Sequence, residues 1–426
     1  MKDLLTKVLE ANNLRTALKS VVRNKGASGV DNLKVSELEP YLKSNWYNLK
    51  TKIEKGEYLP KPILGVEIPK KNGSKRLLGI PTVFDRFIQQ SINQALQTIF
   101  EPEFSVFSYG FRPNRRATDA VLKSQEFINQ GYTFIIDIDL RKFFDMVNHD
   151  YLMSLIYQKV KDPVLHKLIL RFLRAPISLS GVLHKRRQGV PQGSPLSPLL
   201  SNIVLNNLDK ELERLGLRFV RYADDFSIFV KNKTTAEKVY KYIKLFINRR
   251  LHLEVNEDKS SIVRPYKFEF LGYAFVSSFI KGDRGKYQLI VSKSSLKTLK
   301  YKIKQITRKT IPASFDERIL RLRQLMYGWL NYFKYANIKL KLRDLDSWVR
   351  SRLRYCIWHH WKKPNKRMRS FIRLGVKPGI SYAWSRSRMG GWAIAQSPMM
   401  RTTITLNRLK QRGYISFSEY YHKIQH

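Results

Sequence analysis

The sequence predicts an α+β fold built from several domains, and three observations support this class. Short runs of β-branched and aromatic residues occur between longer segments of helical periodicity. A length of 426 residues suggests two to four domains. A hydrophobic content of 43% is enough for large cores and excludes a disordered basic tail. The sequence has no internal repeat, low-complexity segment or obvious flexible linker, so we expect compact domains.

The elements follow one another along the chain in a readable order. Residues 1–55 have mostly helical periodicity, interrupted by a glycine-flanked loop at 25–31. Residues 64–82 alternate like two strands around the hairpin-turn sequence Lys70-Lys71-Asn72-Gly73. Helical periodicity returns from Arg86 to about Ile99, and again from about 290 to 360.

A predicted strand at residues 133–140 carries two acids. The run is too apolar for a surface strand, yet Asp137 and Asp139 lie on one face of it. Burying two carboxylates is unfavourable unless a cation or a hydrogen-bonding partner pairs with them. A bound metal ion could fill this role, and so could the nearby Arg141 or Arg221.

A second acidic pair, Asp224 and Asp225, lies between two short apolar runs that predict a hairpin, residues 219–220 and 226–230. An Asp-Asp pair also occurs in ordinary turns. Pairing with Arg141 or Arg221 explains one acidic strand but not both. Nucleotidyl transfer uses about three carboxylates to hold two metal ions. Asp139, Asp224 and Asp225 could supply them from adjacent strands.

Several motifs in the sequence resemble those of a known protein family. Residues 134–145, 188–199 and 222–225 resemble motifs A, B and C of reverse transcriptases, in the same order and spacing. More narrowly, nearly the whole chain resembles the reverse transcriptase/maturase encoded by bacterial group II introns. Further segments of the resemblance are 78–82 with Asp85-Arg86, 109–113 and 328–333.

The resemblance implies a right-hand polymerase. Its parts would be helical fingers, a β-sheet palm, a helical thumb that is also the maturase region, and a small basic DNA-binding domain. The expected boundaries are an N-terminal extension of the fingers at 1–55, fingers at 56–132, palm at 133–285 (with motif B, the acidic hairpin and the primer grip within 188–280), thumb/maturase region at 286–363 and DNA-binding region at 364–426.

The implied activity is RNA-directed DNA polymerisation from a 3′-hydroxyl primer on an RNA template. Asp139, Asp224 and Asp225 would be catalytic and would hold two Mg²⁺ ions, for which Mn²⁺ could substitute. The implied partners are group II intron RNA, an RNA template/DNA primer duplex, target DNA and dNTPs, with protein partners unknown. Intron RNA binding would assist splicing and mobility of the element. Two alternatives stay open: a splicing cofactor with vestigial polymerase activity, and a reverse transcriptase recruited to host defence or repair.

The resemblance also implies a set of nucleotide-binding residues. Lys70 and Arg76 flank the hairpin at 71–74 and would bind the triphosphate, although both could be solvated surface charges. Phe144 would exclude a 2′-hydroxyl, with Phe143 as its competitor. Gln192 would contact the minor-groove edge of the base pair. Arg112 would contact nucleotide or template, or pair with an acid.

The resemblance also predicts a catalytic lysine and a primer grip. Lys259 matches the motif D lysine, a catalytic residue that would protonate the leaving pyrophosphate. Residues 268–275 resemble the primer grip, with Leu271, Gly272 and Tyr273 at its centre. Gly272 would allow close backbone contact with the primer end, whereas Leu271 and the aromatic residues could equally belong to the core.

Charge marks the last third as a nucleic-acid surface. The chain carries 79 Lys and Arg against 34 Asp and Glu, a net charge of +45, which implies a polyanionic partner. Residues 281–426 hold 34 of the basic residues but only six of the acidic ones. We expect Trp329 and Trp358 to be buried, and Cys356, His359 and His360 are too few and too crowded for a zinc site. The expected nucleic-acid contacts are Arg350, Arg354, Lys362, Lys363 and Arg367.

The sequence also bears on the compartment. No apolar run is long enough to span a membrane and no signal-peptide pattern opens the chain. The single cysteine cannot form an internal disulfide, which fits a bacterial cytoplasm. A tail without further cysteines resembles the shorter, nuclease-free lineage, so we expect no cutting of the second DNA strand.

Overall fold

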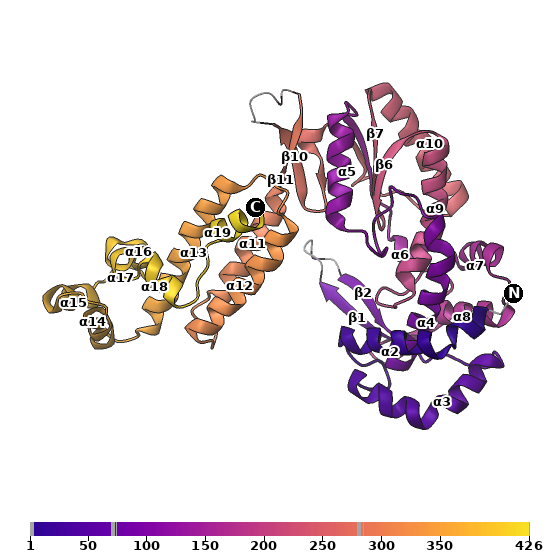
Figure 1. Ribbon diagram of the computed structural model, residues 1–426, viewed down its shortest axis with the longest axis horizontal. Coiled ribbons are helices and arrows are strands. Elements are labelled where there is room, and N and C mark those ends of the chain that lie inside the picture. The colour runs from indigo at the N-terminus through magenta and orange to yellow at the C-terminus, as the bar shows by residue number, and fades with distance from the viewer. Residues whose placement is uncertain (1–3, 70–72, 74, 279–282, 284, 426) are drawn as a thin grey trace. The chain divides into compact units, whose positions relative to one another are not determined.

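The computed structural model describes residues 4–69, 73, 75–278, 283 and 285–425. The chain divides into two compact units (Figure 1), an N-terminal unit, Met1–Arg264, and a C-terminal unit, Pro265–His426. Each unit contains both helices and strands, which confirms the α+β class. Within the described part of the chain, no helix is both long enough and apolar enough to cross a membrane.

The first helices of the N-terminal unit pack around α4 (Val83–Phe100), most of which is buried. The Thr82 hydroxyl accepts a hydrogen bond from the Asp85 amide at 3.1 Å and begins this helix. This confirms the helix expected from Arg86, with a start three residues earlier. The other elements of this region are α1 (Leu4–Val8), α2 (Ala11–Asn24), the 3-10 turn η1 (Val35–Glu37) and α3 (Leu38–Glu54).

A four-stranded sheet beside these helices has the order β2-β1-β4-β5. β1 and β2 pair antiparallel from Leu64↔Ile80 to Pro69↔Lys75, which confirms the predicted hairpin. β1 also pairs in parallel with β4, so a later segment completes this sheet. The strands are β1 (Ile63–Pro69), β2 (Lys75–Ile80), β4 (Ile177–Leu179) and β5 (Val182–His184).

A second sheet, with the order β6-β7-β3-β8 and antiparallel pairs throughout, carries the acidic segments. Its strands are β3 (Phe134–Ile138), β6 (Arg218–Tyr222), β7 (Asp225–Val230) and β8 (Ser261–Val263). Helices α5 (Ala117–Asn129), α9 (Ser197–Arg214) and α10 (Lys233–Leu251) pack against it (Figure 1). The core between sheet and helices is apolar, with Ile136, Phe226 and Ile228 fully buried. The remaining elements are η2 (Glu101–Glu103), α6 (Phe143–Met146), α7 (His149–Lys159) and α8 (Pro163–Arg174).

The C-terminal unit begins with the turn η3 (Pro265–Lys267). A three-stranded antiparallel sheet of order β11-β10-β9 follows. Its strands are β9 (Glu269–Phe270), β10 (Tyr273–Ser277) and β11 (Tyr287–Val291). Three long helices follow and confirm the helical periodicity between 290 and 360: α11 (Lys293–Ile306), α12 (Phe315–Tyr332) and α13 (Lys339–His360).

The basic tail folds as six short helices within the same unit. They are α14 (Pro364–Arg373), α15 (Pro378–Ser385), α16 (Gly391–Gln396), α17 (Pro398–Thr403), α18 (Leu406–Gln411) and α19 (Phe417–Gln425). Asp346 of α13 anchors the last helix, because its carboxylate accepts from the Phe417 and Ser418 amides at 2.7 and 2.9 Å.

Two expectations need adjustment. The expected palm–thumb boundary after residue 285 separates β10 from β11, which are paired strands, whereas the chain divides at Arg264 and Pro265. Trp358 is buried as expected, but Trp329 is only half-buried, with its ring 4.7 Å from the Phe333 ring, centre to centre.

Candidate active site

The turn between β6 and β7 holds the acidic pair. Tyr222 and Asp225 are the last paired residues of the two strands, which confirms the predicted hairpin. Ala223, within the turn, has a φ of +58°, an unfavourable backbone conformation for any residue but glycine. Its carbonyl accepts a hydrogen bond from Arg221 Nη1 at 3.0 Å. This bond holds the turn that presents Asp224.

Arg221 is itself fixed by a fully buried ion pair with Asp209 of α9. Two bonds of 2.7 and 2.6 Å join the guanidinium and the carboxylate, and both side chains are 0% exposed. Arg221 Nη1 also donates to Asn202 Oδ1 at 2.9 Å. Helix α9 therefore sets the position of the acidic turn through two side chains.

Strand register brings the third acid to the same place. β3 pairs with β7 up to Ile138↔Phe226, so the next residues on the two strands are Asp139 and Asp225. The Asp139 amide donates to Ser260 Oγ at 3.0 Å, and the Asp139 carbonyl accepts from the Asn256 amide at 2.8 Å. These bonds hold Asp139 just beyond the end of its strand.

The cation nearest to Asp139 is Lys259, whose Nζ lies 3.0 Å from a carboxylate oxygen. Across the residues that the structure describes, these acids form no ion pair with an arginine, the alternative considered above. Arg221 pairs with Asp209, and Arg141 lies 3.4 Å from Glu254. Among the described residues, the ion pair of these acids is therefore the one between Asp139 and Lys259.

Loss of hydration, and then repulsion among these acids, raises their pKa values. The pKa of Asp225 is raised to about 6, first by loss of hydration within the site and then by the negative charges of Asp224, Asp139 and Asp137. Loss of hydration and Asp139 also raise the pKa of Asp224. The pKa of Asp137 is raised to about 6 by burial, although Ser227 Oγ donates to its carboxylate at 2.9 Å.

The donor set fits a hard divalent cation, which takes carboxylate oxygens and would relieve this repulsion. Asp139, Asp224 and Asp225 are the side chains able to hold it. Within the described residues, however, no three His, Cys, Asp or Glu side chains lie close enough together to form a ready-made metal site. The carboxylates would have to draw together around the ion.

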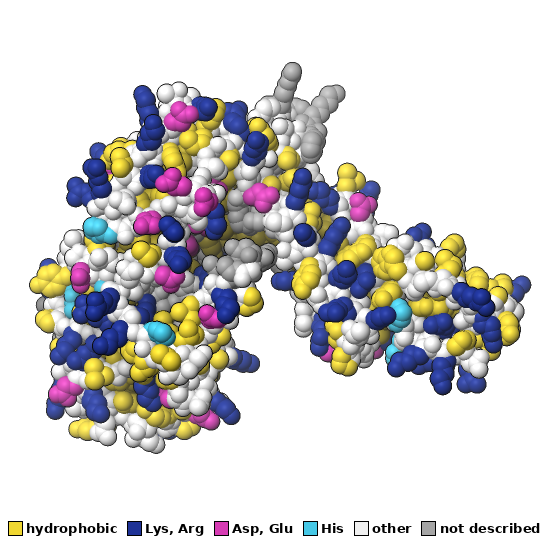
Figure 2. All heavy atoms as spheres, turned by 180° about the vertical axis from the view of Figure 1, so that it is seen from behind, with side chains coloured by type: hydrophobic (Ala, Val, Ile, Leu, Met, Phe, Trp, Pro, Cys, Tyr) yellow, Lys and Arg dark blue, Asp and Glu magenta, His cyan; other side chains and the backbone are white. Residues whose placement is uncertain are grey.

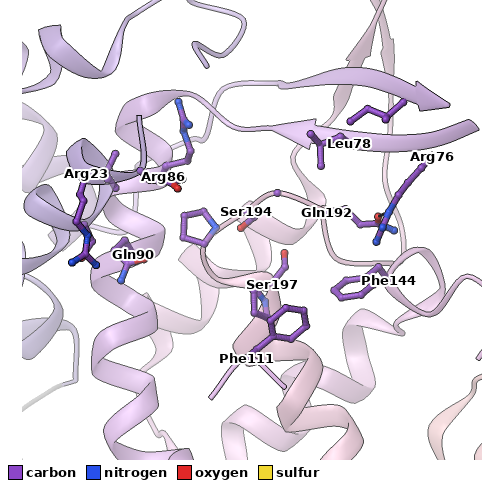
Figure 3. Close-up of a pocket in the computed structure, with 17 residues that line it drawn as sticks. Arg23, Arg76, Leu78, Arg86, Gln90, Phe111, Phe144, Gln192, Ser194 and Ser197 are labelled. Carbon is purple, nitrogen blue, oxygen red and sulfur yellow. Dashed lines mark hydrogen bonds between the residues drawn. The ribbon is translucent and has the colours of Figure 1, made fainter. Parts of the chain in front are cut away.

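A cavity of about 770 Å³ in the N-terminal unit contains three of the predicted nucleotide-binding residues. Arg76 Nε donates to Gln192 Oε1, and in Figure 3 the two side chains meet above the Phe144 ring. Phe144 lines the cavity, whereas Phe143 is buried in the core beside it. Of the two rings, it is therefore Phe144 that faces the cavity.

The loop around Gln192 is pressed closely against its neighbours. The Gly79 amide donates to the Gln192 carbonyl at 2.8 Å. A Cβ on Gly193, whose φ is +119°, would lie 2.5 Å from the Gly79 carbonyl oxygen. Ser194 Oγ donates to Gln89 Oε1 of α4 at 2.5 Å. Strand β2 and helix α4 thus fix the loop from both sides.

Two residues of the predicted set remain, Lys70 and Arg112. Lys70 lies outside the described residues. Arg112 points elsewhere: it pairs with Glu101 at 2.9 Å and donates to the Ser108 carbonyl at 2.8 Å. The nucleotide-binding role expected for Arg112 is therefore corrected to the alternative, pairing with an acid, since its guanidinium is almost fully buried in that pairing.

The far end of the cavity adds residues that sequence reasoning missed. Arg23, Arg86 and Gln90 line it on the side away from Phe144 (Figure 3). Arg86 Nη2 donates to the Ala27 carbonyl and so holds the glycine-flanked loop. The Asp85-Arg86 dipeptide was visible in the sequence, but the position of Arg23 on a surface helix gave no signal.

The predicted primer grip lies in the C-terminal unit. Leu271 and Gly272 form a turn between β9 and β10, with φ values of +50° and +82°. Tyr273 is fully buried, so its side chain belongs to the core. Leu271 and Gly272 are half-buried.

The predicted nucleic-acid contacts are unevenly exposed. Lys362 and Lys363 are exposed, and Arg350 and Arg367 are half-buried. Arg367 lies 4.0 Å from the centre of the Trp358 ring. Arg354 is buried and donates to the Ile404 carbonyl at 3.0 Å, so its role as a surface phosphate contact is corrected to a structural one.

Comparison with known proteins agrees with this arrangement. Residues 68–275 match the family model for reverse transcriptase (RNA-dependent DNA polymerase), and residues 296–374 match the group II intron maturase-specific domain. A partial Cas6-RT-Cas1–Cas2 complex contains a similar chain, with a TM-score of 0.37 and 24% identity over 58% of this chain and 43% of that one.

Two curated relatives are more informative. The group II intron-encoded protein LtrA of Lactococcus lactis subsp. cremoris is 32% identical, over 60% of this chain and 54% of that protein. Protein YkfC of Escherichia coli (strain K12) is 30% identical, over 65% of this chain and 83% of that protein. The match thus spans about half of the first relative and most of the second. The chain belongs to the group II intron-encoded reverse transcriptases, with a polymerase region followed by a maturase-specific domain.

Proposed function

We propose that this protein is an RNA-directed DNA polymerase that extends a 3′-hydroxyl primer on an RNA template and also binds group II intron RNA. The observation that carries the polymerase assignment is the strand register, which sets Asp139 beside Asp225 at the turn that holds Asp224. Reverse transcriptases generally use divalent metal ions. Two bound Mg²⁺ ions, or Mn²⁺ in their place, would activate the primer hydroxyl and stabilise the leaving pyrophosphate.

The remaining side chains have roles that their chemistry supports. Asp139, Asp224 and Asp225 bind the metal ions. Arg76 exchanges its bond with Gln192 for the triphosphate of a dNTP, and Gln192 then contacts the base pair. The Phe144 ring occupies the space that a 2′-hydroxyl would need. Lys259 is close enough to the acids to give a proton to the leaving group.

Primer extension with dNTPs and Mg²⁺ tests the proposal, with wild type beside Asp224→Ala. Loss of a metal ligand should slow extension at least about a thousandfold, roughly 4 kcal/mol of barrier. Asp150→Ala is the matched control, because Asp150 is an exposed aspartate with only a 3.7 Å contact to Arg174. Extension that is equally fast in all three proteins would reject the assigned site.

The C-terminal unit supports the RNA-binding part of the proposal. Its visible face in Figure 2, on the right of the view, is rich in Lys and Arg side chains. A cavity of about 970 Å³ in this unit is lined by apolar side chains such as Trp361, here called its floor, and by basic side chains, here called its cationic rim. The side chains of Lys309, Lys362 and Arg373 on this rim make no hydrogen bond or ion pair within the described part of the chain.

The electrostatics of this cavity favour an anionic ligand. Asp316, the acidic residue among its described lining residues, is paired with Arg412 at 2.7 Å. The pKa of His359 is lowered by burial and by the positive charges of Lys309 and Arg367. Unpaired cations beside an apolar surface suit an unpaired nucleotide, with its phosphate on the rim and its base on the floor.

We include target DNA among the proposed partners of the basic tail, and a bacterial cytoplasm as the site of action. The alternative of a splicing cofactor without polymerase activity predicts intron RNA binding and no extension by wild type. Recruitment to host defence or repair predicts extension without preference for an intron RNA. Binding and extension assays on one preparation therefore separate the three functions.

A further inference from the structure

The turn that joins β9 to β10 has a strained backbone. Leu271 has a φ of +50° and is followed by Gly272 at +82°, so two consecutive residues are left-handed. Glycine adopts this conformation freely, but leucine does so only where its surroundings impose it. Strained residues of this kind cluster at functional sites. The hydrogen bonds and packing contacts around the turn hold Leu271 in this conformation.

Both carbonyls of the turn are bonded. Tyr332 Oη donates to the Leu271 carbonyl at 2.8 Å, and the Ser292 amide donates to the Gly272 carbonyl at 2.9 Å. Tyr273, the residue after the turn, in return donates its hydroxyl to the Tyr332 carbonyl. Tyr332 and the turn are therefore linked in both directions.

The end of α12 also packs against the turn. The Phe333 ring lies 5.0 Å from the Tyr273 ring, centre to centre. A Cβ on Gly272 would lie 3.3 Å from the Phe333 ring and 2.7 Å from Ser295 Oγ. The turn is thus enclosed by α11 and by the end of α12. The Tyr332 hydroxyl is the side-chain donor that reaches the strained leucine.

We propose that Tyr332 is a positioning residue for primer extension, because its hydroxyl holds the Leu271–Gly272 turn in the shape that receives the primer end. This inference rests on the proposed polymerase function and on the assignment of the turn as primer grip. Leu271 lies within the residues that match the reverse transcriptase model, and Tyr332 within those that match the maturase-specific domain. The bond from Tyr332 to Leu271 therefore joins the two matched regions, as does the bond from Tyr273 to the Tyr332 carbonyl.

Tyr332→Phe removes the hydroxyl and keeps the ring. The experiment is single-nucleotide incorporation at saturating dNTP on a fixed RNA template/DNA primer duplex, with active enzyme counted from the burst amplitude. We expect the maximum rate per active enzyme to fall by about three- to tenfold, as one lost hydrogen bond would produce. The dNTP concentration at half-maximal rate should stay unchanged, because the nucleotide cavity is lined by N-terminal residues.

Tyr421→Phe is the matched control. Tyr421 Oη donates to the Ala336 carbonyl at 2.7 Å, a buried tyrosine-to-carbonyl bond near the same end of α12 that does not touch the turn. A merely structural role for Tyr332 would lower the burst amplitude in both variants and leave the rate per active enzyme at the wild-type value. That result overturns the positioning role while extension by wild type preserves the polymerase function. No extension by wild type overturns both.

Discussion

The Lys259 ammonium lies 3.0 Å from a carboxylate oxygen of Asp139, which joins the segment before β8 to the end of β3. Lys259→Gln removes the charge and keeps a similar length. We expect nucleotide incorporation to slow by about a hundredfold or more, because a proton donor beside the leaving group contributes on that scale. Rapid-quench incorporation kinetics measure it.

The unfolding free energy should barely change in Lys259→Gln, since exposed ion pairs contribute about 0–1 kcal/mol. Lys241→Gln on the exposed face of α10 is the control and should retain the wild-type rate. Equal rates in the Lys259 and Lys241 variants would remove Lys259 from the mechanism.

Phe144 and Phe143 give a paired test of sugar selection. Phe144→Val opens the cavity floor, so incorporation of ribonucleotides relative to deoxynucleotides should rise at least about tenfold, equivalent to roughly 1.4 kcal/mol. Phe143→Val should leave that ratio unchanged but lower the unfolding free energy by about 1–3 kcal/mol, because its ring lies in the core. Competition between rNTP and dNTP measures the ratio. A rise in that ratio in the Phe143 variant alone would show that Phe143, and not Phe144, selects the sugar.

Asp85 should make stability depend on pH. It is buried among Tyr58 Oη at 2.7 Å, Thr82 Oγ1 at 2.7 Å and the Lys61 amide at 3.3 Å. Burial raises its pKa from 3.8 to about 6, against the opposing hydrogen bonds and with a smaller contribution from Asp31. Between these values the native state keeps a proton that the unfolded state has released.

Stability from Asp85 is therefore fully present below pH 3.8 and is lost as the pH rises through about 6. Urea unfolding of wild type and Asp85→Asn across pH 4 to 7.5 tests this. The wild-type stability, measured relative to the Asn variant, should fall by roughly 2–3 kcal/mol over that range. A constant difference, or one that grows with pH, would contradict the buried-acid interpretation.

The cationic rim of the C-terminal cavity predicts a change in salt dependence. Replacing Lys309, Lys362 and Arg373 together by Gln should weaken binding of a fluorescein-labelled 20-nucleotide RNA. It should also reduce the slope of log Kd against log salt by about 2, since each lost phosphate contact contributes about 0.7. Fluorescence anisotropy at several salt concentrations measures both effects.

The control for the cavity variant is a triple Gln replacement of Lys238, Lys241 and Arg249 on α10, which removes the same charge from an exposed surface of the other unit. It should retain the wild-type slope. Equal losses in the two triple variants would show a response to total charge and would reject the cavity as a binding site.

Much of the site could be predicted from the sequence because it depends on local pattern. Strand alternation places Asp137 and Asp139 on one face, and the apolar runs around Asp224 and Asp225 predict their hairpin. Thr82 and Asp85 have the pattern of a helix start.

What could not be predicted depends on contacts between distant segments. Arg112 looked available for nucleotide binding until its partner Glu101 was seen, and Arg354 looked like a surface charge until the tail packed over it. Neither partner can be read from residues nearby in the chain. The division at Arg264 likewise depends on which distant segments contact one another.

The buried Arg221–Asp209 pair limits which substitutions the sequence can accept during evolution. Removing one charge would leave the other unpaired where no water reaches it, a loss of about 3–5 kcal/mol. A large part of a domain's stability would be gone in a single step. Positions 209 and 221 should therefore change together or not at all among descendants of this chain, even though neither side chain can meet a substrate. Covariation of positions 209 and 221 would show that the requirement for stable folding restricts the sequence around the catalytic turn.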